Sequence, residues 1–171
     1  MKRYLATLLL ITGFLSSCTL FHPYTVQAPL LVREHAFEEA ARYIGMEYEL
    51  GGQDFPKGID CSGLVVNVYY AVTLETEYRL LFTDAAVVHL HEQYTSRPDE
   101  PQKGDLVFMG ESGVDEVTHV GILDRIEDGT VYFIDSTYME DPPVNGVSYR
   151  SYPEDEPKIK GFGRLLLLKY R

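Results

Sequence analysis

The segment DCSGLVVNVYYAV, residues 60–72, carries the strongest signals of the fold. Asp60 is a residue type that caps helix N-termini, and the apolar run 64–72 predicts a buried helix that begins at Cys61. The first turn of a helix has free N–H groups and a partial positive charge, which favour a thiolate over a thiol and can also bind an oxyanion. Cys61 is therefore a candidate nucleophile, although a lone Cys can also be an inert buried side chain.

Two further helices are predicted, one on each side of this stretch. Apolar residues recur at helical spacing between Glu34 and a terminating Gly45. Thr83 and Asp84 can cap a third helix that runs to about Gln93.

The second half of the chain is rich in short β-type segments that Gly and Asp separate. Helices first and strands afterwards predict an α+β fold, in which N-terminal helices pack on a mostly antiparallel β-sheet. The expected strands are 106–109, 119–123, 131–134, 147–150 and 162–169.

A nucleophilic thiol needs a base that takes up and returns a proton, and histidine suits this role because its pKa lies at about 6.5. Among the five histidines, His119 starts a strand-type segment, THVGIL, between a polar loop and apolar residues. We expect it to emerge at a strand end near the core and take it as the candidate base. The histidines expected at the surface are His22, His35, His89 and His91.

Asp135 ends the apolar run 131–134 of the following strand. A short hairpin would lay this strand beside the one that carries His119, so that the carboxylate could accept the second ring N–H of the imidazole. The alternative is that Asp135 only caps the strand end or lies in a loop.

Length and composition limit the classes of function. A chain of 171 residues, 45% of them apolar and 24% charged, fits one compact domain with a sizeable core. The formal net charge of -11 offers no basic surface to phosphate backbones, so nucleic acid is not an expected partner.

The N-terminal region is expected to be a targeting segment followed by a lipid anchor. It has a basic start, an apolar middle and small residues before Cys18, as a signal peptide has. The sequence LSSC, residues 15–18, resembles the lipobox of bacterial lipoproteins, in which the cysteine is diacylated and becomes the new N-terminus. An ordinary cleaved signal peptide is the alternative. The expected divisions are a signal peptide at 1–17, a lipidated tether at 18–33 and the folded domain at 34–171.

Cys18 and Cys61 are the two cysteines of the chain, and an exported pair would normally suggest a disulfide. Lipidation of Cys18 would prevent that bond. Cys61 would then be a free thiol in an exported protein, where unpaired thiols risk oxidation, and this favours a chemical role for it.

Four ordered blocks of the sequence resemble the NlpC/P60 cysteine peptidases, whose papain-like fold cleaves peptides of bacterial cell walls. YELGG at 48–52 and DCSGLV at 60–65 resemble the family's segment before and through the nucleophile. KGDLVFM at 103–109 and THVGIL at 118–123 resemble the strand before the base and the base strand itself. The blocks follow the family's order and span nearly all of residues 34–170, which makes the resemblance specific.

The resemblance implies a catalytic centre with Cys61 as nucleophile, His119 as general base and Asp135 at the position of the third polar residue. The implied reaction is hydrolysis of an amide in peptidoglycan stem peptides through an acyl-enzyme on Cys61. We expect neither a metal nor a cofactor. The positions that the resemblance implies for substrate contact are Tyr48, Asp60 and Ser62.

Two positions depart from the family's pattern. The third polar position usually carries His, Asn or Gln, whereas the segment FIDS places Asp135 there. An aspartate can still orient the histidine and stabilise its cation, although the pH profile could then differ. Leu50 replaces the usual aromatic residue beside Gly51 and Gly52, so the family's groove shape cannot be carried over to this chain.

Two functions of different classes are compatible with these observations. The first is a cell-wall endopeptidase that a lipid on Cys18 anchors in the bacterial envelope. Thr19 is not the Asp that is typical of inner-membrane retention. We therefore expect the protein in the outer membrane, facing the periplasm, where the source has an outer membrane. The second is a non-catalytic envelope lipoprotein that binds wall peptides or a protein partner in the same groove. The presence of both Cys61 and His119 favours the enzyme. Acyl transfer is less favoured, since the related permuted enzymes that modify lipids place His before Cys.

Overall fold

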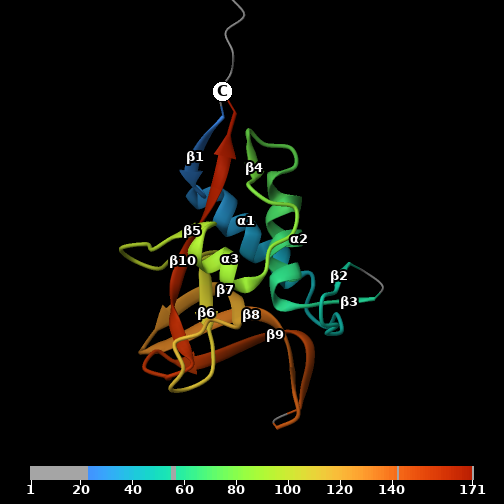
Figure 1. The fold of residues 1–171 in the computed structure, drawn as a ribbon, viewed down its shortest axis with the longest axis vertical. Coiled ribbons are helices and arrows are strands. Elements are labelled where there is room, and N and C mark those ends of the chain that lie inside the picture. The colour runs from blue at the N-terminus through green and yellow to red at the C-terminus, as the bar shows by residue number, and fades with distance from the viewer. Residues whose placement is uncertain (1–22, 55–56, 142, 171) are drawn as a thin grey trace, which may run out of the picture.

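An antiparallel β-sheet with helices on one face makes up the fold (Figure 1). The computed structural model describes residues 23–54, 57–141 and 143–170. The helices are α1 (Leu30–Ala41), α2 (Cys61–Thr73) and α3 (Val87–Glu92). The strands are β1 (Tyr24–Gln27), β2 (Gln53–Asp54), β3 (Gly58–Ile59), β4 (Tyr78–Leu80), β5 (Thr95–Ser96), β6 (Leu106–Met109), β7 (His119–Glu127), β8 (Thr130–Met139), β9 (Val144–Pro153) and β10 (Ile159–Lys169).

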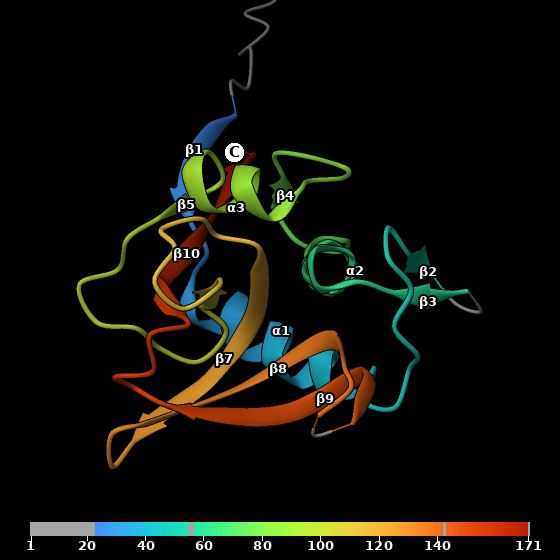
Figure 2. The ribbon, with the colours of Figure 1, turned by 60° about the horizontal axis from the view of Figure 1, so that its bottom comes forward.

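The strand order of the main sheet is β1-β10-β6-β7-β8-β9, and β4 and β5 also pair with β10. β2 and β3 form a separate two-stranded ribbon. Figure 2, which looks nearly along α2, shows β7, β8 and β9 curving across α1. The predicted α+β class, with N-terminal helices on an antiparallel sheet, is confirmed. In the part of the chain that the structure describes, no helix is both long and apolar enough to cross a membrane.

The folded part of the chain begins earlier than the sequence predicts. β1 pairs with β10, and α1 starts directly after Pro29. Pro29 is the N-cap residue, with an extended backbone (φ -64°, ψ 159°), and its missing N–H removes no hydrogen bond of the helix that follows. Val32 and Arg33, which were expected in a tether, are buried in α1. Residues 24–33 therefore belong to the folded domain, whereas the expected signal peptide and lipidation site lie outside the described residues.

Successive side chains of the central strands point to opposite faces of the sheet, so the hydrophobic core has one part on each face. All four residues of β6 are buried. Leu106 and Phe108 pack in the larger cluster with the helices, whereas Val107 and Met109 pack in a smaller cluster with Phe133. Because β6 is covered on both faces, it forms a rigid neighbour for β7, the strand that carries the candidate base.

A two-residue turn joins β7 to β8. Asp128 and Gly129 both have positive φ, 50° and 70°, as a type I′ hairpin turn requires. Glycine adopts such angles freely, and aspartate tolerates them. The resulting pairing, with a bulge between Leu123 and Arg125, brings the end of β8 beside the start of β7. The hairpin expected from the sequence is thus confirmed, but both strands are longer than expected, so that Asp135 lies within β8 and not at its end.

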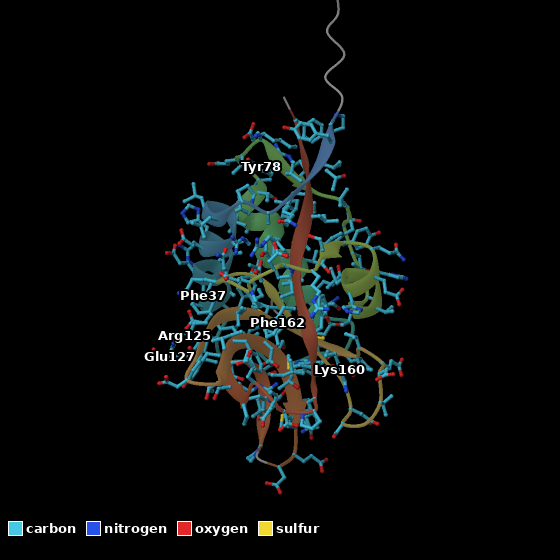
Figure 3. The ribbon with its side chains drawn as sticks, turned by 90° about the vertical axis from the view of Figure 1, so that its left-hand side faces the viewer. Phe37, Tyr78, Arg125, Glu127, Lys160 and Phe162 are labelled. Carbon is cyan, nitrogen blue, oxygen red and sulfur yellow. The ribbon has the colours of Figure 1, made fainter. Side chains whose placement is uncertain are left out.

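A buried ion-pair network connects α1 to β10. Asp105 is fully buried and accepts hydrogen bonds from Arg164 at 2.9 and 2.8 Å and from Arg33 at 3.5 Å. The side chain of Arg33 is only 4% exposed, and the Asp105 carboxylate is the negative charge that compensates its buried positive charge. Figure 3 shows β10 passing along the molecule from the vicinity of Tyr78 toward Lys160.

We expect Asp105→Asn to lower the free energy of unfolding by about 3–5 kcal/mol, because it leaves the buried Arg33 cation without its anion. Urea titration of both proteins measures this change. Asp155→Asn, at an exposed position, is the matched control and should change stability by less than about 0.5 kcal/mol. An equally small effect at Asp105 would contradict a structural role for the network.

Candidate active site

α2 begins at Cys61 because Asp60 caps it, as the sequence predicts. One carboxylate oxygen of Asp60 accepts hydrogen bonds from the Gly63 N–H at 2.7 Å and from the Ser62 hydroxyl at 2.9 Å. The other oxygen accepts from the Gly51 N–H at 3.0 Å. Cys61 is 8% exposed. The cap therefore fixes the first turn of α2 and, with it, the position of the thiol.

The loop before Cys61 lies so close to the first turn of α2 that side chains do not fit between them. The Asp60 N–H donates to the Gly52 carbonyl at 3.0 Å. A Cβ atom on Gly63 would lie 2.4 Å from that same carbonyl oxygen, and one on Gly52 would lie 2.4 Å from the Gly58 carbonyl oxygen. Gly52 and Gly63 thus allow close packing of backbone on backbone.

His119 and Asp135 meet across the β7–β8 hairpin. His119 Nε2 and Asp135 Oδ2 are 2.6 Å apart. The Ile122↔Ile134 register, continued by one residue, places Asp135 opposite Gly121. A Cβ on Gly121 would lie 3.3 Å from the Cβ of Asp135, so the missing side chain leaves room for the carboxylate to reach His119. The structure therefore places Asp135 where the sequence suggested, and not in a loop.

The imidazole of His119 lies between a carboxylate and the thiol. Because Nε2 faces Asp135, the other ring nitrogen remains for Cys61, which lines the same cavity. Burial lowers the pKa of His119, but hydrogen bonds to Asp135 and Cys61 and their negative charges outweigh burial and raise it to about 9. At neutral pH the ring is then protonated beside the sulfur, an arrangement that can hold a thiolate–imidazolium pair.

A cavity of about 400 Å³ opens over Cys61 and His119. The phenol of Tyr48 faces it, and burial, followed by the negative charges of Cys61 and Asp60, raises the pKa of this phenol. Tyr48 therefore stays protonated and can donate a hydrogen bond. The polar residues of the cavity include all three positions proposed for substrate contact: Tyr48, Asp60 and Ser62. Its apolar wall consists of Ala86, Val87, Val88 and Val117.

Leu50 lies at the mouth of this cavity and is 82% exposed. A large exposed aliphatic side chain at a cavity edge offers apolar contact area to a bound molecule. The groove is thus apolar at its entrance and on the α3 side, and polar along the loop that precedes Cys61.

The other described histidines do not reach the site. His35 on α1 and His89 and His91 on α3 are exposed, as the sequence predicts. The His91 ring packs edge-on against Phe108 with 4.8 Å between centroids. His22 lies outside the described residues.

Arg150 on β9 is a member of the site that no motif of the sequence indicated. Its Nε donates to Asp135 Oδ1 at 2.9 Å, and a terminal nitrogen donates to Oδ2. Burial raises the pKa of Asp135, but the hydrogen bonds from His119 and Arg150 outweigh this effect and hold it below its usual value. One signal could have found Arg150: a carboxylate within a buried strand needs a counter-charge, and the next strand contains this arginine.

Residues 45–160 match the model of the NlpC/P60 family. Similar solved structures include a protein similar to lipoproteins, of the NLP/P60 family, from Staphylococcus aureus, at 21% identity over 82% of this chain and 43% of that one, with a TM-score of 0.52. NlpC1 from Trichomonas vaginalis is 25% identical over 78% of this chain and 44% of that one, with a TM-score of 0.54. NlpC2 from the same organism is 20% identical over 79% and 47%, with a TM-score of 0.56. The chain thus spans less than half of each of these proteins, and no curated protein matches it.

Proposed function

This chain belongs to the NlpC/P60 family, whose members are generally cell-wall peptidases, and we propose that it is a cysteine peptidase that hydrolyses an amide bond in peptidoglycan peptides. The observation that carries the proposal is one cavity lined by both Cys61 and His119, with His119 bonded to Asp135 on its other side. This is the arrangement that nucleophile, base and orienting group need.

In the proposed reaction, the Cys61 thiolate attacks the carbonyl carbon of the scissile amide. Backbone N–H groups in the first turn of α2 stabilise the oxyanion, and the protonated His119 gives its proton to the leaving amine. A water molecule then attacks the thioester while His119 takes its proton, and Cys61 leaves as the thiolate. Asp135 keeps the imidazole oriented through both steps.

The cavity walls suggest which part of a peptide they contact. Asp60 and Glu116 give the cavity a negative edge, which suits a free amino group of the substrate. Both oxygens of Asp60 already accept hydrogen bonds from backbone N–H groups nearby. We therefore expect Asp60 to act on the substrate through its negative charge and through the helix cap that it forms, and less by accepting a further hydrogen bond. Tyr48 and Ser62 are the polar residues proposed to contact the peptide alongside it.

We also propose that the protein is anchored in the bacterial envelope by a lipid on Cys18, facing the periplasm from the outer membrane where one is present. In support, β1, through which the described chain enters the fold, lies at the end of the molecule opposite to the β8–β9 hairpin (Figure 1). A lipid attached upstream of β1 would leave the hairpin end pointing away from the membrane.

Alkylation of Cys61 by iodoacetamide distinguishes this enzyme from a non-catalytic wall-binding lipoprotein. We expect His119→Ala to slow alkylation at about pH 6 by a factor on the order of 100, because an unassisted thiol is almost fully protonated there. Reaction rates are read from the mass of the intact protein, with urea-unfolded protein as the reference. His91→Ala, at an exposed position, should leave the rate unchanged.

Equal rates for the native protein, the His119→Ala variant and the unfolded chain would contradict an activated nucleophile. The groove would then be a binding site only.

A further inference from the structure

Asp135 is held between two basic side chains. Arg150 binds both of its oxygens, and one of these oxygens also faces His119 Nε2 at 2.6 Å. Asp135 is fully buried, and the Arg150 side chain is 14% exposed. With both oxygens engaged, the carboxylate has no freedom to turn away from the imidazole.

Arg150 is itself held in place by its neighbours. Asp135 pairs with Ser148 across β8 and β9, and Arg150 follows two residues later on the same face. Its guanidinium lies 5.6 Å from the ring centroid of Phe133 and 5.5 Å from that of Tyr152. A lysine could still lie over these rings, but it cannot reproduce the bidentate pairing of a planar guanidinium with a carboxylate.

The charges around His119 show why this pair matters for catalysis. Asp135 is hydrogen-bonded to the ring and fully buried, so little water screens its charge, and Arg150 is its counter-charge. The titratable groups that line the Cys61 cavity with His119 are Tyr48, Asp60, Cys61 and Glu116. Those that line the adjoining cavity of about 190 Å³ on the other side of the ring are Glu111, Arg150, Tyr152 and Lys158.

We propose that Arg150 is a positioning residue of the active site: it fixes Asp135 against His119 and offsets the aspartate charge, so that the imidazole is oriented without holding its proton too tightly. This inference rests on the proposed function for its catalytic meaning. It assigns the orienting role to the Asp135–Arg150 pair as a unit.

The two members of the pair are expected to move the His119 pKa in opposite directions. Arg150→Gln leaves the Asp135 charge without its counter-charge and should raise the His119 pKa by about one pH unit. Asp135→Asn removes the anion but keeps the Arg150 cation nearby, so it should lower the pKa by at least as much. Combining the two changes restores a neutral pair, and the pKa should lie between those of the single variants.

The experiment measures the His119 pKa in the full chain by NMR titration of the ring carbons, together with the pH dependence of peptide turnover. The variants are Arg150→Gln, Asp135→Asn, the double variant and Arg150→Lys. Arg125→Gln is the matched control, because Arg125 pairs with Asp124 and Glu127 near the end of β7 that lies away from His119 (Figure 3). We expect opposite shifts in the single variants, no shift in the control, and at least ten-fold more turnover in the double variant than in Asp135→Asn.

An unchanged His119 pKa in Arg150→Gln, or a double variant no more active than Asp135→Asn, would overturn the proposal. If Arg150→Gln does not fold, Arg150→Lys decides: it keeps the charge but not the bidentate contact, and turnover equal to that of the unchanged protein would refute positioning. Because the titration does not require hydrolysis, an unchanged protein that titrates as expected but cleaves no peptide would count against the proposed function alone.

Discussion

Cys61→Ala is expected to reduce hydrolysis of wall peptides by a factor on the order of a million, since removal of a nucleophile that acts together with its base has an effect of this size. His119 and the backbone donors of α2 would remain, but no covalent intermediate could form. The fold should persist, because the substitution removes one sulfur from the start of a helix whose cap and packing are unchanged. Chromatography of released peptides and thermal unfolding measure the two effects.

Cys61→Ser is the matched variant for this prediction, because it keeps the size and polarity of the side chain but not its nucleophilicity. Its activity should fall nearly as far as that of the alanine variant. Full activity of Cys61→Ser, with loss only in Cys61→Ala, would indicate that Cys61 serves for packing and that the nucleophile lies elsewhere.

Cys18→Ser is expected to move the protein from the membrane to the soluble fraction. Two or three acyl chains give stable anchoring at about 0.8 kcal/mol per buried methylene, and a serine at this position is not lipidated. Detergent-phase partitioning and incorporation of labelled palmitate measure the change. Cys61→Ser, which leaves the lipobox intact, should remain in the detergent phase.

If Cys18→Ser still enters the detergent phase and still takes up palmitate, Cys18 does not carry the lipid and the lipoprotein assignment is wrong. Loss of palmitate without loss of partitioning would show that Cys18 is lipidated but that another segment also holds the protein on the membrane, which would contradict anchoring by this lipid alone.

The central part of the fold could be predicted because its signals are local. The continuous apolar run of β6 and the Asp128–Gly129 turn each specify a structure by themselves. The capped helix that begins at Cys61 does so as well. β1 and β4 could not be predicted, since such short strands depend on the edge that β10 offers them.

The start of α3 shows a different reason for a wrong prediction. Thr83 and Asp84 are good capping residues, but the helix begins at Val87 with Ala86 before it and no side-chain cap. Phe82 and Ala85 are buried in the core between the helices and the sheet. Tertiary packing of this segment thus outweighs the local capping preference.

The site could be predicted only as far as its chemistry is visible in single residues. Cys61 and His119 each stand out through a reactive side chain at the start of an element, Asp135 stands out through a carboxylate directly after an apolar run, and the structure brings them together. Arg150 does not stand out, because within β9 it is one polar residue in an alternating strand. Its role depends on the β8–β9 register and on the burial of Asp135.

Digestion of purified peptidoglycan peptides in water labelled with heavy oxygen, read by mass spectrometry, tests whether Cys61 catalyses hydrolysis of an amide. We expect the unchanged protein to release fragments cut at one amide bond, with one heavy oxygen atom in the new carboxylate, and Cys61→Ala to release none. Fragments without the label would indicate acyl transfer instead of hydrolysis. Intact peptides after exposure to folded protein across the pH range, or equal cleavage by Cys61→Ala, would contradict hydrolysis through Cys61.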